Sequence, residues 1–252
     1  MSGSQYYRAA YKKLDEKLNL DYVKEKIEKC IDKLYLPKPN SDGIIPQSDQ
    51  FLTLKKLDLT KYKESKEVLT IYNDFNTKQL NEYMVSKQAD TVMLFFLLDT
   101  LFDEEVKRKN FIFYEDKTLH DSSLSKSTHA ILANDFGFNE MAYDLYERAL
   151  TIDLGTQMKS SNEGIHSASI GGIWESTVMG FGGVRMQGEY LRISPKLPEK
   201  WKKLVFPLQF QGNSLNVIVT PNTVTVANNG NKDVKWLQLK QTKKKKEIYN
   251  RE

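Results

Sequence analysis

The chain has 252 residues, of which 40% are hydrophobic and 11% aromatic, so it can bury a core in one large domain or in two smaller ones. Its 37 basic and 33 acidic residues give a net charge of only +4, and it carries no nucleic-acid-binding motif. The most apolar run, residues 92–98, is about a third of the length that a bilayer needs, and the polar N-terminus lacks the apolar core of a signal peptide. We therefore expect a cytoplasmic protein that binds neither nucleic acid nor a membrane.

A charged segment over residues 5–36 has helical periodicity, and Pro37 and Pro39 end it. Cys30, the only cysteine, falls among the apolar side chains of this helix, so we expect a thiol in the core. A single cysteine excludes an internal disulfide and a cysteine-based metal site. We expect no metal and no cofactor.

The middle of the chain is predicted to be helical after one long ordered loop, residues 44–76. A loop of that length in a compact domain is usually functional or lines a cavity. The periodicity then predicts helices over 77–101, 103–113, from Ser125 or Ser127 through 133, 139–150 and 167–181. Their short connections are compatible with a toroid of helical hairpins and with a bundle.

The pattern changes after Gly182 and Gly183, where short runs of period two begin. Strands are predicted over 190–193, 204–210, 215–219, 223–226 and 234–239. Helices followed by strands suggest separate domains. The fold class is mainly α with a C-terminal β domain: a helical domain over 1–182, a small antiparallel sheet or sandwich over 183–241, and a solvated basic tail over 242–252.

Three serines precede the helix predicted from Ser125 or Ser127. Ser122, Ser123 and Ser125 offer hydroxyl and backbone N–H donors at a helix start, where the terminal N–H groups lack intrahelical partners. Such a helix start binds an oxyanion such as phosphate without a charged side chain. Ordinary serine capping is the alternative interpretation.

A second candidate anion loop comprises residues 160–166 and ends at His166, at the start of the 167–181 helix. An imidazole there can donate to a phosphate oxygen, and more strongly when protonated. The small residues that follow, including Gly171 and Gly172, allow close packing or close approach of a ligand. A histidine tied to a backbone carbonyl is the alternative.

Lys87 and Gln88 are adjacent polar residues at the entry to an apolar helix. Polar groups that enter a cavity hydrogen-bond sugar hydroxyls well. The alternative is a solvated helix face.

Several long motifs together resemble one family, glycoside hydrolase family 65, the group of maltose, kojibiose, trehalose and nigerose phosphorylases. The resemblance extends from about residue 25 to 225 and concerns the C-terminal part of the family's proteins. The motifs that carry it are residues 44–47, 87–90, 110–115, 120–125, 163–166, 171–174, 180–183 and 193–198.

The resemblance implies the latter half of an (α/α)6 barrel followed by a small β domain. It also implies inverting phosphorolysis of an α-glucosidic disaccharide to β-glucose 1-phosphate, with inorganic phosphate as co-substrate. By position, Ser122, Ser123 and His166 match the family's phosphate-binding loops, and Lys87 and Gln88 match its sugar-binding pair. A glycosyltransferase-type enzyme is implied, whose partners are a disaccharide and phosphate.

The resemblance also implies that the general acid, a glutamate, lies upstream of this chain, as do the aromatic residues and the specificity loop of the glucose site. Neither Glu163 nor Glu175 takes the acid's place, so no catalytic residue is assigned and the isolated chain is expected to be inactive. The expected protein partner is a missing N-terminal half or a second copy. Two alternatives stay open: a family 65 hydrolase, favoured by a carboxylate near residue 166, and a non-catalytic half-barrel that binds carbohydrate or serves assembly.

Overall fold

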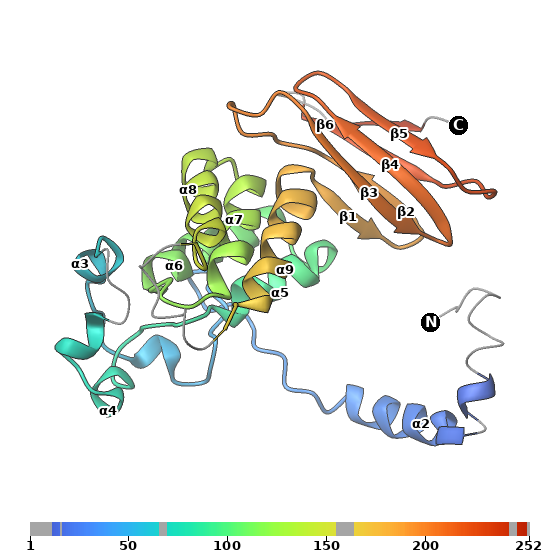
Figure 1. Cartoon of the computed structure of the whole chain (residues 1–252). Coiled ribbons are helices and arrows are strands. Elements are labelled where there is room, and N and C mark those ends of the chain that lie inside the picture. Colours follow the sequence, from blue (N-terminus) through green and yellow to red (C-terminus); the bar gives the residue numbers. More distant parts are fainter. Residues whose placement is uncertain (1–11, 16, 66–69, 155–163, 242–245, 251–252) are drawn as a thin grey trace. The chain divides into compact units, whose positions relative to one another are not determined.

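A computed structural model describes residues 12–15, 17–65, 70–154, 164–241 and 246–250 (Figure 1). The chain divides into two compact units, residues 1–38 and 39–252. None of the helices in the described ranges combines the length and the apolar character that crossing a bilayer requires.

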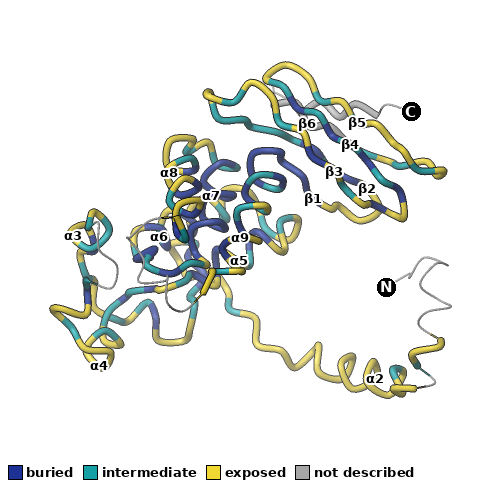
Figure 2. Tube along the Cα trace, viewed as in Figure 1, coloured by how far each residue is buried: buried dark blue, intermediate teal, exposed yellow. Residues whose placement is uncertain are grey.

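The N-terminal unit contains helix α2, Leu20–Ile31, which begins after Asn19, whose side chain accepts a hydrogen bond from the N–H of Tyr22. The helix is amphipathic, but its apolar side chains are exposed (Figure 2). Cys30 is also exposed, so the prediction of a core thiol is wrong. Helical periodicity shows that a helix has an apolar face, but not what covers that face.

In the second unit, the segment predicted to be one loop contains short helical turns, and the helix predicted over 77–101 is interrupted. A capping box between Asn76 and Gln79 starts a single helical turn. The chain then extends, and Ser86 forms an isolated parallel bridge with Thr118. The elements are η1 Phe51–Thr53, α3 Thr60–Lys63, η2 Thr70–Asn73, α4 Thr77–Leu80, α5 Asp90–Leu97, η3 Asp99–Leu101, α6 Glu104–Lys117, α7 Ser125–Asp135, α8 Asn139–Leu150, α9 Ser167–Glu175 and the π-helix η4 Ser176–Phe181.

Helix α7 is the centre of the helical part, since every residue from Ser125 to Asn134 is buried (Figure 2). Its apolar side chains share a core with α5, α6, α8 and the end of η4. Its first turn is polar and nonetheless buried, comprising Ser125, Lys126, Ser127, Thr128 and His129. Buried polar groups need partners, and those partners define the candidate site.

The C-terminal part consists of two sheets that share one apolar core. Side chains of β1 and β2 lie in the same cluster as those of β3 and β4, so the sheets pack as a small sandwich. The strands are β1 Val184–Gln187, β2 Tyr190–Ile193, β3 Leu204–Phe210, β4 Asn213–Val219, β5 Val224–Asn228, β6 Trp236–Gln241 and β7 Lys246–Asn250.

One sheet has the order β1-β2-β6-β7 and the other the order β3-β4-β5. The pairing is antiparallel apart from β2 and β6, which run parallel. Strand β7 occupies part of the segment predicted as a basic tail and pairs with β6. The lysine run suggested a solvated tail, but Ile248 and Tyr249, which favour strands, follow it.

Candidate functional site

Helices α7 and α9 run in the same direction, and the start of α5 lies beside the start of α7. Gly172 of α9 lies against Ser127 in the first turn of α7. Further along, Gly180 of η4 lies against Ile131, which is one turn after Ser127 in α7. Gln88, which precedes α5, and Ser122, which precedes α7, also contact each other. Helices α6 and α8 connect these three. Their C-terminal ends lie beside the starts of α5 and α9, where Ser86 pairs with Thr118 and Asp153 contacts His166. Three helix N-termini therefore gather at one end.

Gln88 and Ser122 contact each other directly, although the sequence assigned them to a sugar site and a phosphate loop. The Gln88 Nε2 donates to the Ser122 Oγ over 2.9 Å, and the same Oγ accepts from the N–H of Leu124 over 3.2 Å. With both acceptor positions filled, the Ser122 hydroxyl hydrogen is left to donate to a ligand. The two predicted subsites are therefore adjacent.

Ser123 is half-buried, and its side chain has no hydrogen-bond partner among the described residues. The side chain of Leu124 does not cap α7. Ser123 therefore does not cap α7, whereas the bond between Ser122 and the Leu124 N–H is a local side-chain-to-backbone contact of the capping kind. Lys87 is exposed and interacts electrostatically with Asp121.

His166 precedes α9 and is oriented by a carboxylate that the sequence analysis did not select. Its Nδ1 lies 2.6 Å from the Asp153 Oδ1, and its backbone N–H donates to the Asp153 Oδ2 over 3.0 Å. The hydrogen bond from His166 lowers the pKa of Asp153, which is therefore ionised at neutral pH. The other ring nitrogen, Nε2, makes no hydrogen bond within the described part of the chain. Glu163 lies outside the described residues.

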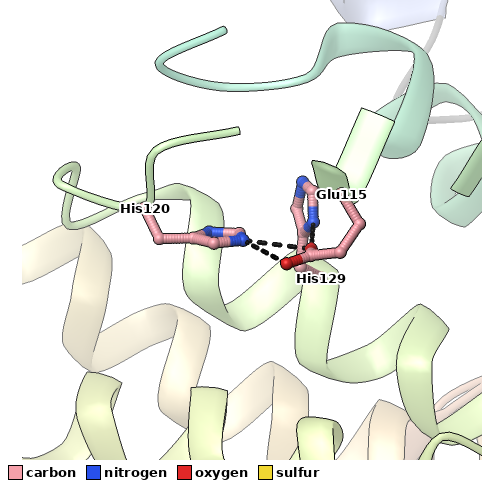
Figure 3. A group of neighbouring side chains, drawn as sticks. All are labelled: Glu115, His120 and His129. Atoms are coloured by element: carbon pink, nitrogen blue, oxygen red, sulfur yellow. Dashed lines mark hydrogen bonds and ion pairs between the residues drawn. The ribbon is translucent and has the colours of Figure 1, made fainter. Parts of the chain in front are cut away.

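Behind residues 119–125, which we call loop 119–125, a buried carboxylate gathers two imidazoles (Figure 3). The Nε2 of His120 lies 3.0 Å from both oxygens of Glu115, and the Nδ1 of His129 lies 2.5 Å from Oε2. The Nζ of Lys63 contacts Oε1 over 3.1 Å. We call these four residues the Glu115 cluster.

The ionisation of the cluster follows from these contacts. Burial opposes ionisation of Glu115, but the hydrogen bonds from His120 and His129 outweigh it and lower the pKa of Glu115 far below its usual value. Burial lowers the pKa of His120 to about 3, so this imidazole is neutral at pH 7.

Glu115, His120 and His129 also have the composition of a metal site, with ligand atoms within 4.8 Å of one another. However, the carboxylate already accepts from both imidazoles and, over 3.1 Å, from the Lys63 ammonium. The positive charge of Lys63 would repel a divalent cation bound to the same carboxylate. A hydrogen-bonded network therefore fits these residues better than a metal ion. That the chain holds no metal stays a prediction.

Two further charged groups lie at loop 119–125: Asp121 within it and Lys126, the residue that follows it in α7. Lys126 is buried and donates to the carbonyl of His120 and, over 3.1 Å, to that of Ser122. Burial lowers the pKa of Lys126 to about 8, so it is largely protonated at neutral pH. Burial raises the pKa of Asp121, while Lys87 and Lys126 act against that shift.

The structure thus brings Gln88 and Ser122 together, leaves Ser123 without a partner beside them, and places His166 at the parallel start of α9. The sequence analysis did not select Asp153, Lys126 or the Glu115 cluster. Glu115 lies in a motif that carried the resemblance, which was a usable signal. Asp153 lies in no such motif, and only the fold reveals its contact with His166.

Comparison with known proteins identifies the family of the chain. Residues 5–175 match the glycosyl hydrolase family 65 central catalytic domain, and residues 184–236 match the C-terminal domain of that family. A solved structure, a candidate kojibiose phosphorylase from the human microbiome, superposes with a TM-score of 0.77 at 25% identity, covering 94% of this chain and 32% of that one.

Among curated proteins, a kojibiose phosphorylase of Halothermothrix orenii is 44% identical over 196 residues, which are 78% of this chain and 25% of the relative. An alpha,alpha-trehalose phosphorylase of Thermoanaerobacter brockii is 34% identical and covers 86% of this chain and 28% of its own length. A maltose phosphorylase of Bacillus subtilis is 32% identical, and the matched residues are 83% of this chain and 28% of the relative.

The chain therefore spans about a quarter of the length of these curated relatives. Within that span, the matches to the two domains follow each other in the order in which the helices and the sheets follow each other here. This chain belongs to glycosyl hydrolase family 65.

Proposed function

We propose that this chain supplies the phosphate-binding part, and part of the sugar site, of an inverting disaccharide phosphorylase. The whole enzyme would cleave an α-glucosidic disaccharide with phosphate to give β-glucose 1-phosphate. The observation that carries the proposal is the 2.9 Å contact between Gln88 and Ser122, because it places a sugar-binding candidate beside a phosphate-binding candidate. In phosphorolysis the two substrates must meet at one carbon atom.

The donors at this site suit an oxyanion. The hydroxyls of Ser122 and Ser123 can donate, and the N-terminus of α7 contributes orphan N–H groups. At the start of α9 the N–H groups of Ser167 and Ser169 donate to the carbonyls of Ile165 and His166, so this helix contributes mainly its positive dipole end. When its imidazole is protonated, His166 donates from Nδ1 to Asp153 and from Nε2 to phosphate. Lys126 adds a buried positive charge behind loop 119–125.

The alternating directions of α5 to α9 are those of consecutive hairpins in an (α/α)6 barrel, and we propose that these helices form part of one. In the complete enzyme, a glutamic acid upstream would protonate the leaving glycosidic oxygen. Phosphate, held by the residues above, would attack the anomeric carbon from the opposite face, where an inverting hydrolase places water.

A hydrolase is the second candidate, because a carboxylate does lie near residue 166. However, both carboxylate oxygens of Asp153 are hydrogen-bonded to His166: Oδ1 to the ring Nδ1 and Oδ2 to the backbone N–H. It orients the imidazole and is not free to act as a base on water. The relatives described above are named as phosphorylases.

Phosphate binding to the chain tests the proposal. We expect phosphate to shift the NMR amide signals of residues 122–127 and to bind with a dissociation constant measurable by calorimetry. Ser123→Ala should weaken phosphate binding roughly ten- to a hundredfold, since a hydrogen bond to a charged group contributes ~1.5–3 kcal/mol. His166→Ala should do the same.

Ser41→Ala, an exposed serine in a distant turn, is the matched control and should leave the affinity unchanged. Equal phosphate binding by the wild-type chain and both site variants would contradict the assignment. If phosphate does not bind but β-glucose is released from a disaccharide by the complete enzyme without phosphate, the hydrolase is the better description.

A further inference from the structure

Loop 119–125 contains a backbone conformation that its own sequence does not favour. His120 has φ 59°, in the left-handed region that residues with a side chain rarely adopt. Such a conformation persists where the surroundings over-determine it, and these cases gather at functional sites. The contacts that hold His120 therefore show what shapes the loop.

Three contacts fix His120. The ring is held at both nitrogens, with Nε2 on Glu115 at 3.0 Å and Nδ1 on the Ser125 Oγ at 3.1 Å. The carbonyl accepts from Lys126. Ring and backbone are thus tied to α6 on one side and to α7 on the other.

The direction of the hydrogen bonds follows from the charges. Ionised Glu115 can only accept, so the neutral His120 ring carries its proton on Nε2 and donates it. Nδ1 then accepts from the hydroxyl of Ser125. On its other side Glu115 accepts from His129 and from Lys63, whose Nζ also donates to the Glu115 carbonyl over 2.7 Å.

Ser122 and Ser123 lie between the two anchored residues, His120 and Ser125. We propose that Glu115 is a positioning residue: through His120 and Ser125 it holds loop 119–125 in the shape that presents Ser122 and Ser123 to phosphate. This inference rests on the proposed function. Glu115 itself is buried behind the loop, so it acts without touching the ligand.

Glu115→Gln tests the inference, because it removes the charge and keeps the shape of the side chain. We expect phosphate affinity to fall roughly tenfold or more, as when a charged hydrogen bond is lost. The matched control is Asp116→Asn on the same helix. The exposed side chain of Asp116 forms an ion pair with Lys117 and makes no other polar contact within the described ranges. This control should bind phosphate as the wild type does.

Glu115→Gln leaves Lys63 without its counter-ion and can unfold the chain, so a second variant targets the other end of the hydrogen-bond chain. Ser125→Ala removes the donor to Nδ1 without leaving a buried charge, and it should also weaken phosphate binding. Its control is Ser127→Ala, because the buried Ser127 Oγ has no hydrogen-bond partner among the described residues. Equal affinity losses in Ser125→Ala and Ser127→Ala would overturn the inference.

NMR of the ligand-free chain measures the protonation and backbone conformation of His120 directly. A variant that only lowered the stability of the chain would leave these signals unchanged. In the wild type, ring ¹⁵N shifts should report His120 protonated on Nε2, and its Cα and Cβ shifts should report a left-handed backbone. In Glu115→Gln both signatures should change while Asp116→Asn keeps them. Unchanged His120 signals in a folded Glu115→Gln variant would overturn the inference.

These readouts separate the inference from the proposed function. Phosphate that fails to bind the wild-type chain contradicts the function, whereas the His120 signals still test the role of Glu115. A Zn²⁺ titration tests whether the Glu115 cluster is instead a metal site. We expect no stoichiometric binding, and Zn²⁺ taken up with loss of the Nε2 proton of His120 would replace the positioning role with a metal site.

Discussion

At the scale of single residues, two adjacent glycines in α9 have different surroundings. Gly171 has open space around its Cα, with nothing within 4 Å of an added Cβ. At Gly172 an added Cβ would lie 2.7 Å from the Cβ of Ser127 and still closer to its Oγ. Gly172 thus allows the close contact that brings the starts of α7 and α9 together.

We therefore expect Gly172→Ala to destabilise the chain by ~1–3 kcal/mol, the usual cost of overpacking a core. A Cβ–Cβ clash cannot be relieved by rotating a side chain, so one helix must shift. The measurement is the free energy of unfolding from urea titration followed by circular dichroism.

Gly171→Ala is the matched comparison one residue away. It adds the same methyl group to open space and should stabilise the helix by up to about 1 kcal/mol, because alanine favours helices more than glycine does. Similar changes for the two variants would show that the helices do not meet at Gly172.

These glycines also show what sequence can predict at this scale. The small residues correctly indicated close packing, but a helix start does not reveal which of two neighbours faces a partner. The same holds for the charged groups. Gln88 and Ser122 came from motifs, whereas Asp153 is 13 residues from its partner His166 and only the fold brings the two together.

At the scale of elements, the carboxylate of Asp99 joins the helical part to the sheets, as does that of Asp135, which contacts Arg185 of β1. Asp99 of η3 contacts the Nζ of Lys107 in α6 and the Nη2 of Arg192 in β2, each over 2.6 Å. Burial raises the pKa of Asp99, but the hydrogen bond from Lys107 and the charges of Arg192, Lys107 and Arg185 outweigh it, and the pKa is lowered.

We expect Asp99→Asn to lower the free energy of unfolding by ~3 kcal/mol at pH 7, because two poorly exposed cations lose their counter-ion. The folded-state pKa of Asp99 lies below its unfolded value of about 4. The stabilisation is therefore complete above pH ~5 and is lost as the pH falls toward the folded-state pKa.

Urea titrations of wild type and Asp99→Asn between pH 7 and pH 3 measure this effect. The difference between the two should shrink as the pH falls. Asp103→Asn is the control, since Asp103 is exposed and its side chain makes no capping hydrogen bond to α6. A difference that stays constant with pH would show that the ion pairs do not stabilise the joint.

The elements themselves were predicted well where local signals and tertiary packing agree. Helices α7 and α8 and strands β2 and β3 lie where periodicity placed them. The helix predicted over 77–101 is interrupted because Ser86 pairs with Thr118, a contact distant in sequence. Parallel pairing of β2 with β6 likewise depends on the whole sheet and leaves no local signal.

At the scale of the whole molecule, the described part of the chain exposes large apolar side chains on its helices. On α9, Ile170 and Trp174 lie one turn apart and are 50% and 51% exposed. Leu97 of α5 and Leu101 of η3 are 66% and 69% exposed. We expect these side chains to be covered by another part of a larger fold.

These 252 residues correspond to about a quarter of the length of the relatives. The resemblance places the general acid and the aromatic glucose-binding residues upstream of this stretch. General acid catalysis typically contributes 10²–10⁴-fold, and an incomplete sugar site loses the positioning of the disaccharide as well. We therefore expect these residues alone to bind phosphate and to perform no phosphorolysis.

The assay is the formation of β-glucose 1-phosphate from kojibiose, maltose and trehalose in phosphate buffer, with the kojibiose phosphorylase of Halothermothrix orenii as the positive control. Turnover by this chain would show that a carboxylic acid within it serves as the acid, and Asp121, whose pKa burial raises, would be the first residue to replace. Without turnover, addition of the part of the relative that precedes the matched residues, as a separate chain, tests whether the exposed faces of α5 and α9 accept it. Activity that appears only in the mixture would show that the phosphate-binding part and the acid-bearing part are separable pieces of one site.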